Sequence, residues 1–263
     1  MDARLKAVVL AAALAFSGCA AAFDHSHGDW TVLLRKHVVL AEGAKASRLS
    51  YGAIAQERGA LQKYLASLSA VNEAQFDGWS RDEQMAFLIN AYNAFTVEKV
   101  LSRYPDLRSI WDFGRFFGNP FRDRFFSLFG SKTSLDGIEH GMLRKRYRDP
   151  RVHYAINCAS VSCPMLREEA YVAERLQQQL EEQARRFLSD RSRNRVRAGR
   201  LEVSKLFEWF REDFEPLDAY LARYAALLAE EPGEQGRIAA RALPIAFLDY
   251  DWSLNDSRSS SRR

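Results

Sequence analysis

One segment of the chain limits the fold more than any other, because it is apolar on nearly every side. It begins at the capping box Ser80-Arg81-Asp82-Glu83, and Pro105 is expected to end its helix at Tyr104. The apolar positions in it are Phe87, Leu88, Ile89, Ala91, Tyr92, Ala94, Phe95 and Val97. A helix with so little polar surface is stable only when other elements cover it. We therefore predict a central buried helix with the rest of the chain packed around it.

The remaining patterns predict an α+β fold, a mostly helical single domain around the buried helix with a small β-sheet. Apolar spacing, capping residues and prolines predict further helices over residues 29–40, 51–68, 135–147, 172–188, 204–210 and 216–229. Compact or alternating apolar runs predict strands over residues 125–129, 152–158 and 245–254. A hairpin over residues 194–203 should turn at Gly199, and residues 230–236 should form a loop.

The N-terminus has the features of an export signal. Two basic residues precede an apolar run that is too short to span a bilayer. Small residues then lead to Cys19, as in the lipobox of bacterial lipoproteins, and ordinary secretory cleavage among residues 20–22 is the alternative. We predict a signal peptide over 1–18, a lipid-anchored linker over 19–28, a folded domain over 29–254 and a disordered basic tail over 255–263. The protein is then expected in the cell envelope, anchored to the membrane through Cys19 and facing the periplasm.

Composition and motifs exclude several classes of protein. The chain is 47% hydrophobic and 12% aromatic, which is far from the composition of disordered proteins. Its formal net charge is +4 at pH 7, and most of that charge lies in the N-terminal segment and the Ser/Arg tail, so the folded body is close to neutral. The sequence has no Gly-rich phosphate loop, no His-Glu-x-x-His helix, no Gly-x-Ser-x-Gly elbow and no paired Cys-x-x-Cys knuckles. We therefore predict no cofactor and no nucleic-acid partner.

Cys158 and Cys163 are the cysteines that remain once Cys19 is set aside. In an oxidising compartment such a pair most simply forms a disulfide, which would stabilise so short a loop by only ~2 kcal/mol. One sulfur could instead be a nucleophile, because a nearby histidine can lower the pKa of a thiol. Metal ligation is a third alternative, although the spacing fits no standard zinc pattern. The sequence leaves all three open.

Two histidines and a carboxylate lie close to these cysteines in the sequence. Glu139 and His140 stand together in the predicted helix over 135–147, and His153 falls in the predicted strand over 152–158. A cysteine, a histidine and a carboxylate form the constellation of a thiol hydrolase. The alternative is structural, with buried histidines bonded to backbone carbonyls and Glu139 favouring a helix N-terminus through the macrodipole.

Two amides interrupt the predicted buried helix. Asn90 and Asn93 are three residues apart, so they share one face. Unpaired amides are costly in an apolar interior, and each must therefore bond a partner. They act either as staples, which hold a loop in place through hydrogen bonds to its backbone, or as groups that orient a catalytic residue. Buried polar groups usually find a hydrogen-bond partner nearby, which favours staples.

Together these segments resemble the domain-of-unknown-function 547 (DUF547) family. The similarity is carried, in order, by Phe87-Leu-Ile-Asn-Ala-Tyr-Asn-Ala94, Ser134-Leu-Asp, Ile138-Glu-His140, Leu143-Arg144, Asp149-Pro-Arg-Val-His153, Asn157-Cys158, Ser162-Cys163-Pro164, Ser204-Lys-Leu-Phe-Glu-Trp-Phe210 and Asp213-Phe214. Leu88 stands where the family typically has Trp, so no stacking role is assigned there. The resemblance implies a fold and an envelope context but no activity. It directs attention to Asn90, Asn93, Glu139, His140, His153, Asn157 and the two cysteines.

These observations lead to alternative functions. The first is a thiol-dependent hydrolase or acyl transferase with papain-like chemistry, in which Cys158 or Cys163 is the nucleophile, His140 the base and Glu139 its orienter. The supporting binding positions would be Asn90, Asn93, His153 and Asn157. The second is a non-catalytic envelope lipoprotein that binds a small molecule, a peptide or a partner and uses the cysteine pair as a disulfide brace. A third is metal binding by the histidines and cysteines.

Overall fold

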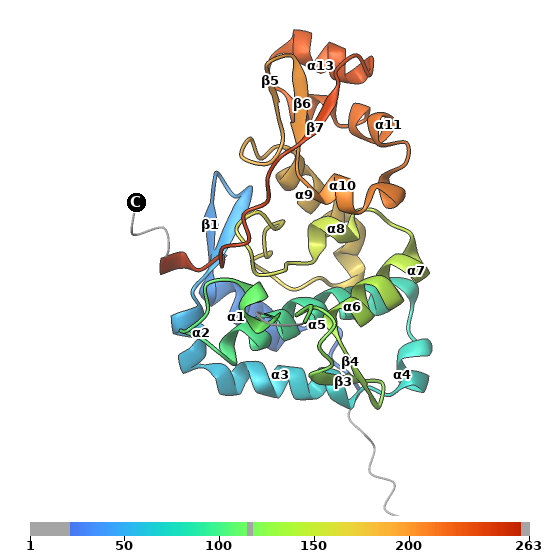
Figure 1. Cartoon of the computed structure of the whole chain (residues 1–263). Helices are drawn as coiled ribbons and strands as arrows, with labels where there is room; N and C mark the ends of the chain where they lie inside the picture. Colours follow the sequence, from blue (N-terminus) through green and yellow to red (C-terminus); the bar gives the residue numbers. More distant parts are fainter. Residues whose placement is uncertain (1–21, 115–117, 259–263) are drawn as a thin grey trace, which may run out of the picture.

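The structure is a computed structural model, and it describes residues 22–114 and 118–258 (Figure 1). The predicted signal peptide, Cys19 and the last part of the predicted tail lie outside the described residues. Within the described residues, no helix is both long enough and apolar enough to cross a membrane.

Both ends of the described chain pack against the folded body. The ring of Phe23 lies edge-to-face on that of Phe87, with the centroids 5.3 Å apart. Near the other end, the Leu49 N–H donates to the carbonyl of Asn255 at 2.9 Å, and the Asn255 N–H donates to the carbonyl of Ala159 at 3.1 Å. The packed region therefore extends beyond residues 29–254 in both directions.

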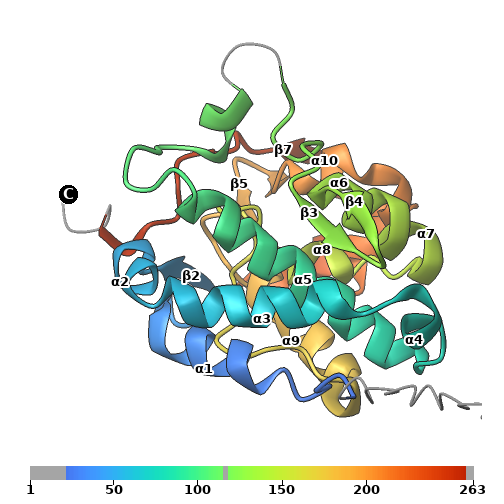
Figure 2. The ribbon, with the colours of Figure 1, turned by 90° about the horizontal axis from the view of Figure 1, so that it is seen from below.

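Helix α5 (Arg81–Leu101) is the buried centre of the fold, as predicted, and helix α3 (Arg58–Ala70) runs alongside it (Figure 2). The predicted capping box is present, because the Ser80 hydroxyl accepts from the Glu83 N–H while the Glu83 carboxylate accepts from the Ser80 N–H. The helix ends at Leu101, short of the predicted end at Tyr104, since the residues before a proline disfavour helical geometry.

An N-terminal layer covers one side of α5. It consists of α1 (Gly28–His37), β1 (Val38–Ala41), β2 (Ala46–Leu49), α2 (Tyr51–Gln56), α3 (Arg58–Ala70) and α4 (Glu73–Asp77). The helix predicted over 29–40 stops at His37, because the β-branched residues that follow pair with β2. The helix predicted over 51–68 is broken at Glu57 into α2 and α3.

Within the described residues, the β-structure is divided among three small sheets rather than gathered in one. The strands beyond β2 are β3 (Phe126–Leu128), β4 (Ser131–Thr133), β5 (Arg195–Arg197), β6 (Arg200–Val203) and β7 (Ile245–Phe247). The β5–β6 hairpin turns at Gly199, as predicted, with φ +74°. Strand β7 pairs in parallel with β6 and covers only the start of the strand predicted over 245–254.

The middle of the chain contains the largest departure from the predicted elements. Helix α6 (Leu135–Ile138), a π-helical turn (Glu139–Leu143) and α7 (Arg144–Tyr147) together fill the helix predicted over 135–147. The strand predicted over 152–158 is wrong, because it folds as helix α8 (Val152–Ala155) followed by an irregular loop. A short apolar run carries too little periodicity to distinguish a buried strand from a buried helical turn.

The C-terminal part adds five helices within the described residues. They are α9 (Leu176–Leu188), α10 (Leu206–Trp209), α11 (Leu217–Ala222), α12 (Ala225–Leu228) and α13 (Pro232–Ala239). Helix α13 replaces the loop predicted over 230–236, and it begins with Pro232 in the first turn, where a missing N–H is harmless.

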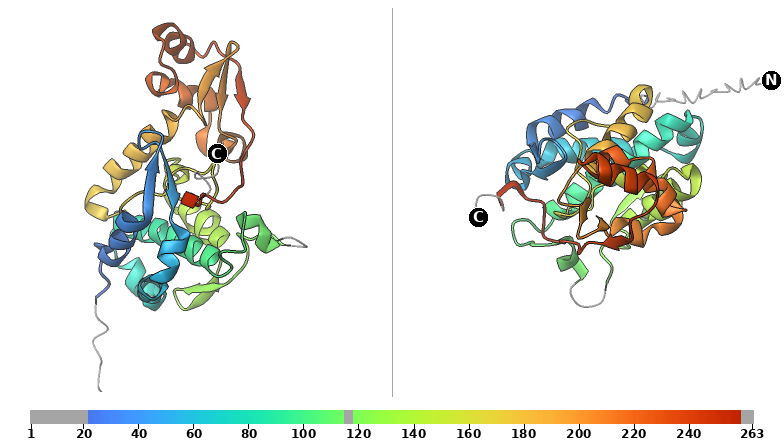
Figure 3. Two further views of the ribbon diagram at one scale, coloured as in Figure 1. Left: turned by 90° about the vertical axis from the view of Figure 1, so that its left-hand side faces the viewer. Right: turned by 90° about the horizontal axis from the view of Figure 1, so that it is seen from above.

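Two apolar clusters make up the core. The larger surrounds α5, and the smaller includes Phe187, Phe207, Phe214 and Tyr220. In the left view of Figure 3, the orange strands and helices of the C-terminal part lie together at one end of the molecule. Helix α8 connects them, because its Tyr154 belongs to the smaller cluster while its neighbours belong to the larger. The predicted fold class is confirmed as α+β and mostly helical.

Candidate functional site

A cleft of about 480 Å³ opens where α5, the π-helical turn, the loop after α8, α10 and the C-terminal segment meet. Five of the residues predicted from the sequence line it, namely Glu139, His140, His153, Cys158 and Cys163. The cleft therefore brings together residues from the predicted helix over 135–147 and from the segment around the two cysteines.

The loop that carries Cys158 is held in one conformation by buried amides. The Asn157 side chain donates to the carbonyl of Pro164 at 2.7 Å and accepts from the Ala159 N–H at 3.0 Å. Ala159 itself has φ +63°, a left-handed conformation that is unfavourable for a residue with a Cβ. Such backbone strain persists only where the surroundings fix the chain, and it is common at functional sites.

Cys158 is half-buried at the cleft, and hydroxyl groups surround its sulfur. The Ser160 and Tyr250 hydroxyl oxygens lie 3.1 and 3.3 Å from Sγ. Burial would raise the pKa of Cys158, but hydrogen bonding to Cys163, Ser160 and Tyr250 outweighs it and brings the pKa to about 7. A large fraction of this sulfur is therefore thiolate near neutral pH, which is the form that acts as a nucleophile.

Cys163 lies deeper, and both cysteines are free thiols. The Cys158 N–H donates to Cys163 Sγ at 2.8 Å. Burial, together with the adjacent Cys158, raises the pKa of Cys163 well above that of an ordinary thiol. The predicted disulfide is thus not formed, and Cys158 is the more reactive sulfur. Across the described residues, no group of three or more His, Cys, Asp or Glu side chains is placed to hold a metal ion.

Glu139 points into the protein from the π-helical turn. Burial, the nearby charge of Asp136 and that of Cys158 raise the pKa of Glu139 to about 8, against the lowering effect of Arg144 and Tyr92. Its carboxyl group is consequently protonated at neutral pH. π-Helical turns inside α-helices frequently occur at functional sites, and this one turns a carboxyl group inward beside a thiol.

His153 stands between two carboxyl groups. Its Nε2 lies 2.6 Å from Asp213 Oδ2, and its Nδ1 lies 3.9 Å from Glu139 Oε1. Burial lowers the pKa of His153, although Asp213 acts in the opposite direction. The neutral ring therefore donates from Nε2 to Asp213 and turns its unprotonated Nδ1 toward Glu139. Arg144 holds Asp213 from the other side through Nε at 2.6 Å.

His140 occupies the rim of the cleft, with 42% of its side chain exposed. The Arg144 guanidinium donates to its Nδ1 at 2.9 Å, and its Nε2 lies 3.8 Å from Asp136. Burial lowers the pKa of His140, so the ring is neutral. Adjacent residues on a helix face different directions, so Glu139 and His140 diverge and Glu139 does not orient this ring.

The histidines and the cysteines share the cleft without touching. Throughout the described residues, neither sulfur forms a hydrogen bond with either His140 or His153. The polar side-chain groups in hydrogen-bonding contact with the Cys158 sulfur are the Ser160 and Tyr250 hydroxyls, and Glu139 lines the same cleft with a pKa that responds to the charge of Cys158. The papain-like pairing of a cysteine with a histidine is therefore not what the structure shows.

The predicted amides lie behind the cleft and act as staples. Asn90 donates to the carbonyl of Tyr171 and accepts from its N–H, at 2.8 and 3.0 Å. Asn93 donates to the carbonyl of Ala155 at 3.0 Å and accepts from the Asn157 N–H at 2.8 Å. Asn93 and Asn157 therefore fix the backbone on which Cys158 stands, without reaching the cleft.

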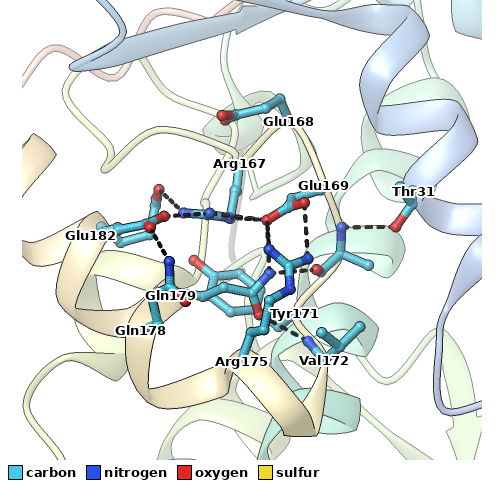
Figure 4. A network of polar contacts seen from close by, with 12 residues as sticks. Thr31, Arg167, Glu168, Glu169, Tyr171, Val172, Arg175, Gln178, Gln179 and Glu182 are labelled. Atoms are coloured by element: carbon cyan, nitrogen blue, oxygen red, sulfur yellow. Dashed lines mark hydrogen bonds and ion pairs between the residues drawn. The ribbon is translucent and has the colours of Figure 1, made fainter.

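A second polar cluster, called the brace below, stabilises the chain just after this loop (Figure 4). It consists of Arg167, Glu169, Arg175, Gln179 and Glu182. Glu169 receives hydrogen bonds from both arginines and from Gln179, at 3.0 to 3.1 Å for the closest contacts. Burial would raise the pKa of Glu169, but these bonds hold it at about 2.

Sequence reasoning missed several residues that line the cleft or contact the residues lining it. Asp213 and Arg144 belong to short motifs of the DUF547 resemblance, yet nothing in their local sequence points to His153. Tyr250 falls in the alternating run over 245–254, which pairs as a strand for only three residues. The signal that could have found it is the density of aromatic residues in that run, including Trp252.

Comparison with known proteins supports the resemblance to the DUF547 family but assigns no activity. Among curated proteins and among solved structures, no match was found. Residues 76–188 match the family model described as a protein of unknown function, DUF547, and this range includes α5, the π-helical turn, both cysteines and the brace. Over residues 76–188 the chain is therefore similar to the DUF547 family.

Proposed function

We propose that the cleft is the active site of a thiol-dependent acyl-transfer enzyme, a hydrolase or an acyl transferase, with Cys158 as its nucleophile. The observation that carries this proposal is the pairing of two groups with shifted pKa values. Cys158 has a pKa of about 7 and Glu139 a pKa of about 8, so thiolate and protonated carboxyl coexist near neutrality. Perturbed pKa values in a cleft are a general mark of catalytic sites.

The chemistry follows from these two protonation states. The Cys158 thiolate attacks the carbonyl carbon of an ester or amide, and the bond to the leaving group breaks as Glu139 gives that group its proton. A thioester on Cys158 and a Glu139 carboxylate remain. The carboxylate then takes a proton from water, or from another acceptor, as that molecule attacks the thioester. The acyl group leaves on the acceptor, and the thiolate and the protonated carboxyl are restored.

The groups behind Glu139 are assigned positioning roles. Asp213 fixes the tautomer of His153, which presents an unprotonated Nδ1 to Glu139. Arg144 neutralises Asp213, so that a second buried negative charge does not raise the pKa of Glu139 further. Cys158, Glu139, His153 and Asp213 are together called the thiol site below. The sequence predicted His140 as the catalytic base and Glu139 as its orienter, whereas here Glu139 is the group that gives and takes the proton.

A reaction with p-nitrophenyl acetate tests the proposal on the reduced full-length chain. We expect an acetyl group on Cys158, located by mass spectrometry of peptides, and no adduct after Cys158→Ala. The rate should rise with pH through a midpoint near the pKa of about 7. Tyr250→Phe should move that midpoint upward, because it removes a hydroxyl 3.3 Å from the sulfur. Tyr220→Phe, which removes a buried hydroxyl bonded to Tyr154, is the matched control.

Two results would count against this proposal. One is a Cys158 that stays inert to both the ester and iodoacetamide across the pH range. The other is functional protein in which the two sulfurs are found joined. Either outcome would favour the alternative, a ligand- or partner-binding protein whose two cysteines form a structural disulfide.

The proposed enzyme acts in the cell envelope, anchored through Cys19 and facing the periplasm. The support is the basic and apolar start of the chain followed by small residues before that cysteine. Cells fed an alkyne-bearing fatty acid should incorporate it into the wild-type chain and not into Cys19→Ala. Label that persists in the variant, or protein that stays in the cytosol, would contradict this location.

A further inference from the structure

We propose that the aromatic wall of the cleft is a binding platform for a saccharide, and that Cys158 acts on an acyl group carried by a sugar. The second half of this statement rests on the proposed function, whereas the first does not. The aromatic wall consists of Trp111, Trp209, Tyr250 and Trp252, all of which line the cleft.

Two rings of this wall are exposed although they are large and apolar, and the other two are partly buried. Trp209 is 44% exposed and Trp111 is 36% exposed, and both belong to the small set of large apolar residues that reach solvent among the described residues. Exposed apolar surface gathered on one wall of a cleft marks a binding site. These two residues lie far apart in the sequence, so the fold itself assembles the wall.

The rings support one another in a fixed arrangement. Trp209 stacks on Trp252 with centroids 5.6 Å apart and planes 27° apart. Tyr250 packs on both, at 4.8 and 4.6 Å, and Trp111 meets Trp252 edge-to-face at 5.3 Å. A ligand that stacks on such a platform does not have to order flexible side chains, which favours binding.

Tyr250 connects the platform to the reactive sulfur. Its ring belongs to the aromatic wall, while its hydroxyl oxygen lies 3.3 Å from Cys158 Sγ. A molecule that lies on the wall therefore places its neighbouring substituents beside the thiolate. The platform and the nucleophile are parts of one site rather than two.

Part of the remaining lining of the cleft is polar. Asp136, Asn119, Arg122 and His140 contribute a carboxylate, an amide, a guanidinium and an imidazole. Arg122 and Asp136 bond each other at 3.3 Å and leave most of the guanidinium in solvent. A cleft lined by both flat rings and hydrogen-bonding groups suits a ligand with an apolar face and a polar edge. A pyranose ring, with C–H groups on its faces and hydroxyls around its edge, has that chemistry.

Other ligands fit the cleft less well. A long acyl chain needs an enclosed aliphatic tunnel, whereas among the described residues of the lining only Ile156 and Leu206 supply branched aliphatic side chains to this open cleft. A nucleotide could stack on the rings, but its phosphates would meet the Asp136 carboxylate. Arg122, which supplies the guanidinium among the described residues of the lining, is already paired with that carboxylate. A neutral sugar avoids both difficulties.

Calorimetric titration of full-length Cys158→Ala tests the platform without turnover. The probes are chitotriose, which bears N-acetyl groups, maltotriose, which has none, sodium octanoate and adenosine monophosphate. We expect chitotriose to bind at concentrations up to about 10 mM and Trp209→Ala to weaken it by about tenfold or more, the loss of one stacking contact. Leu40→Ala, at a residue 45% exposed on β1 outside the cleft, is the matched control and should leave binding unchanged.

The outcomes separate this inference from the proposed function. Three results would overturn the platform. They are binding of octanoate or adenosine monophosphate in place of both saccharides, no saccharide binding at all, and no effect of Trp209→Ala. Acetylation of wild-type Cys158 by p-nitrophenyl acetate is measured in parallel. If the sulfur is acetylated and no saccharide binds, only the platform fails. If saccharide binds and the sulfur is inert, the platform stands while the acyl-transfer chemistry, and with it the acylated-sugar substrate, fails.

Discussion

The brace and the thiol site each contain a glutamate that is at least partly buried, but their surroundings shift the pKa of that glutamate in opposite directions. In the brace, Glu169 faces two arginines, and these contacts hold its pKa at about 2, far below that of an ordinary glutamate. In the thiol site, Glu139 is buried among other acids, and its pKa rises to about 8. One glutamate is therefore fixed as an anion, and the other stands ready to exchange its proton.

This difference separates a structural network from a candidate active site. A buried ion pair whose members all have partners positions the chain and has no proton to give at neutral pH. A carboxyl group with a raised pKa is a burden on stability at neutral pH, because folding must keep it protonated. Such a group is expected where its proton is used. The same criterion distinguishes Cys158 from Cys163, since only the former has its pKa lowered toward neutrality.

The largest expected effect is that of Glu139→Gln on activity. The amide fills the same space but cannot protonate a leaving group, so acylation of Cys158 by an alkyl ester should slow by about 10²–10³-fold. Stability should move the other way. Because the pKa of Glu139 is raised to about 8, its neutral form favours folding fully below about pH 4.5, and that contribution is lost as the pH rises toward 8. The variant should therefore unfold at a higher urea concentration than the wild type at pH 9.

Glu169→Gln is the matched control for that prediction. The pKa of Glu169 is lowered to about 2, so its charge stabilises the fold above about pH 4.5, and this contribution disappears as the pH falls toward 2. The variant should lose stability at neutral pH and keep its acylation rate. If both glutamine variants shift stability in the same direction at pH 9, the contrast between the two clusters is wrong.

The next effect is a loss of stability on removing Arg167. Arg167 is 4% exposed, and its guanidinium donates to both Glu169 and Glu182. Arg167→Met removes the cation that these two carboxylates share in a partly buried position, and about 3 kcal/mol of unfolding free energy should be lost. Urea denaturation measures this change. The acylation rate per folded molecule should remain within about twofold, since no group of the thiol site is touched.

Asp213→Asn should have an intermediate effect on both properties. It removes the anion that accepts from His153 Nε2 and from Arg144. The His153 tautomer is then no longer fixed, and the acylation rate should fall by about tenfold. Breaking the contact to Arg144 should also lower stability by about 1–2 kcal/mol. A change in stability with no change in rate would place Asp213 with the brace instead of the thiol site.

The sequence was sufficient for features that depend on nearby residues. The capping box at Ser80 and the apolar stretch after it predicted α5, because both are local signals of a buried helix. The hairpin at Gly199 was predicted for the same reason, since its turn requires a left-handed residue. The run over 152–158 failed because a segment of that length has no decisive period, and tertiary packing made it the helix α8.

The candidate site was predicted in composition but not in arrangement. Neighbours in sequence suggested that Glu139 would orient His140, whereas a helical turn sends the two side chains in different directions. The actual partner of His153 is Asp213, sixty residues further along the chain, and no local pattern encodes that contact. The aromatic wall likewise gathers residues from three distant segments. Such contacts follow from the fold and not from spacing.

The smallest expected effect concerns the strained residue beside the nucleophile. Ala159→Gly relieves a left-handed conformation that costs about 1–2 kcal/mol. Against this gain stand about 0.4–1 kcal/mol for the added freedom of glycine in the unfolded chain and about 0.8 kcal/mol for a lost buried methyl group. Stability in urea should thus change by less than about 0.5 kcal/mol. Acylation should still slow a few-fold, because the backbone that aims Cys158 becomes less rigid.

Ala198→Gly shows what relief of strain does away from the thiol site. Ala198 also has a left-handed φ, +48°, but it is exposed in the β5–β6 hairpin, so no buried methyl group is lost. Stability should therefore rise by about 0.5 kcal/mol with no change in acylation rate. If Ala159→Gly and Ala198→Gly alter acylation equally, or if neither does, then the strain at Ala159 is a property of the turn and has no role in positioning the nucleophile. A loss of rate confined to Ala159→Gly would instead show that the fold tolerates a strained residue there because it aims the sulfur.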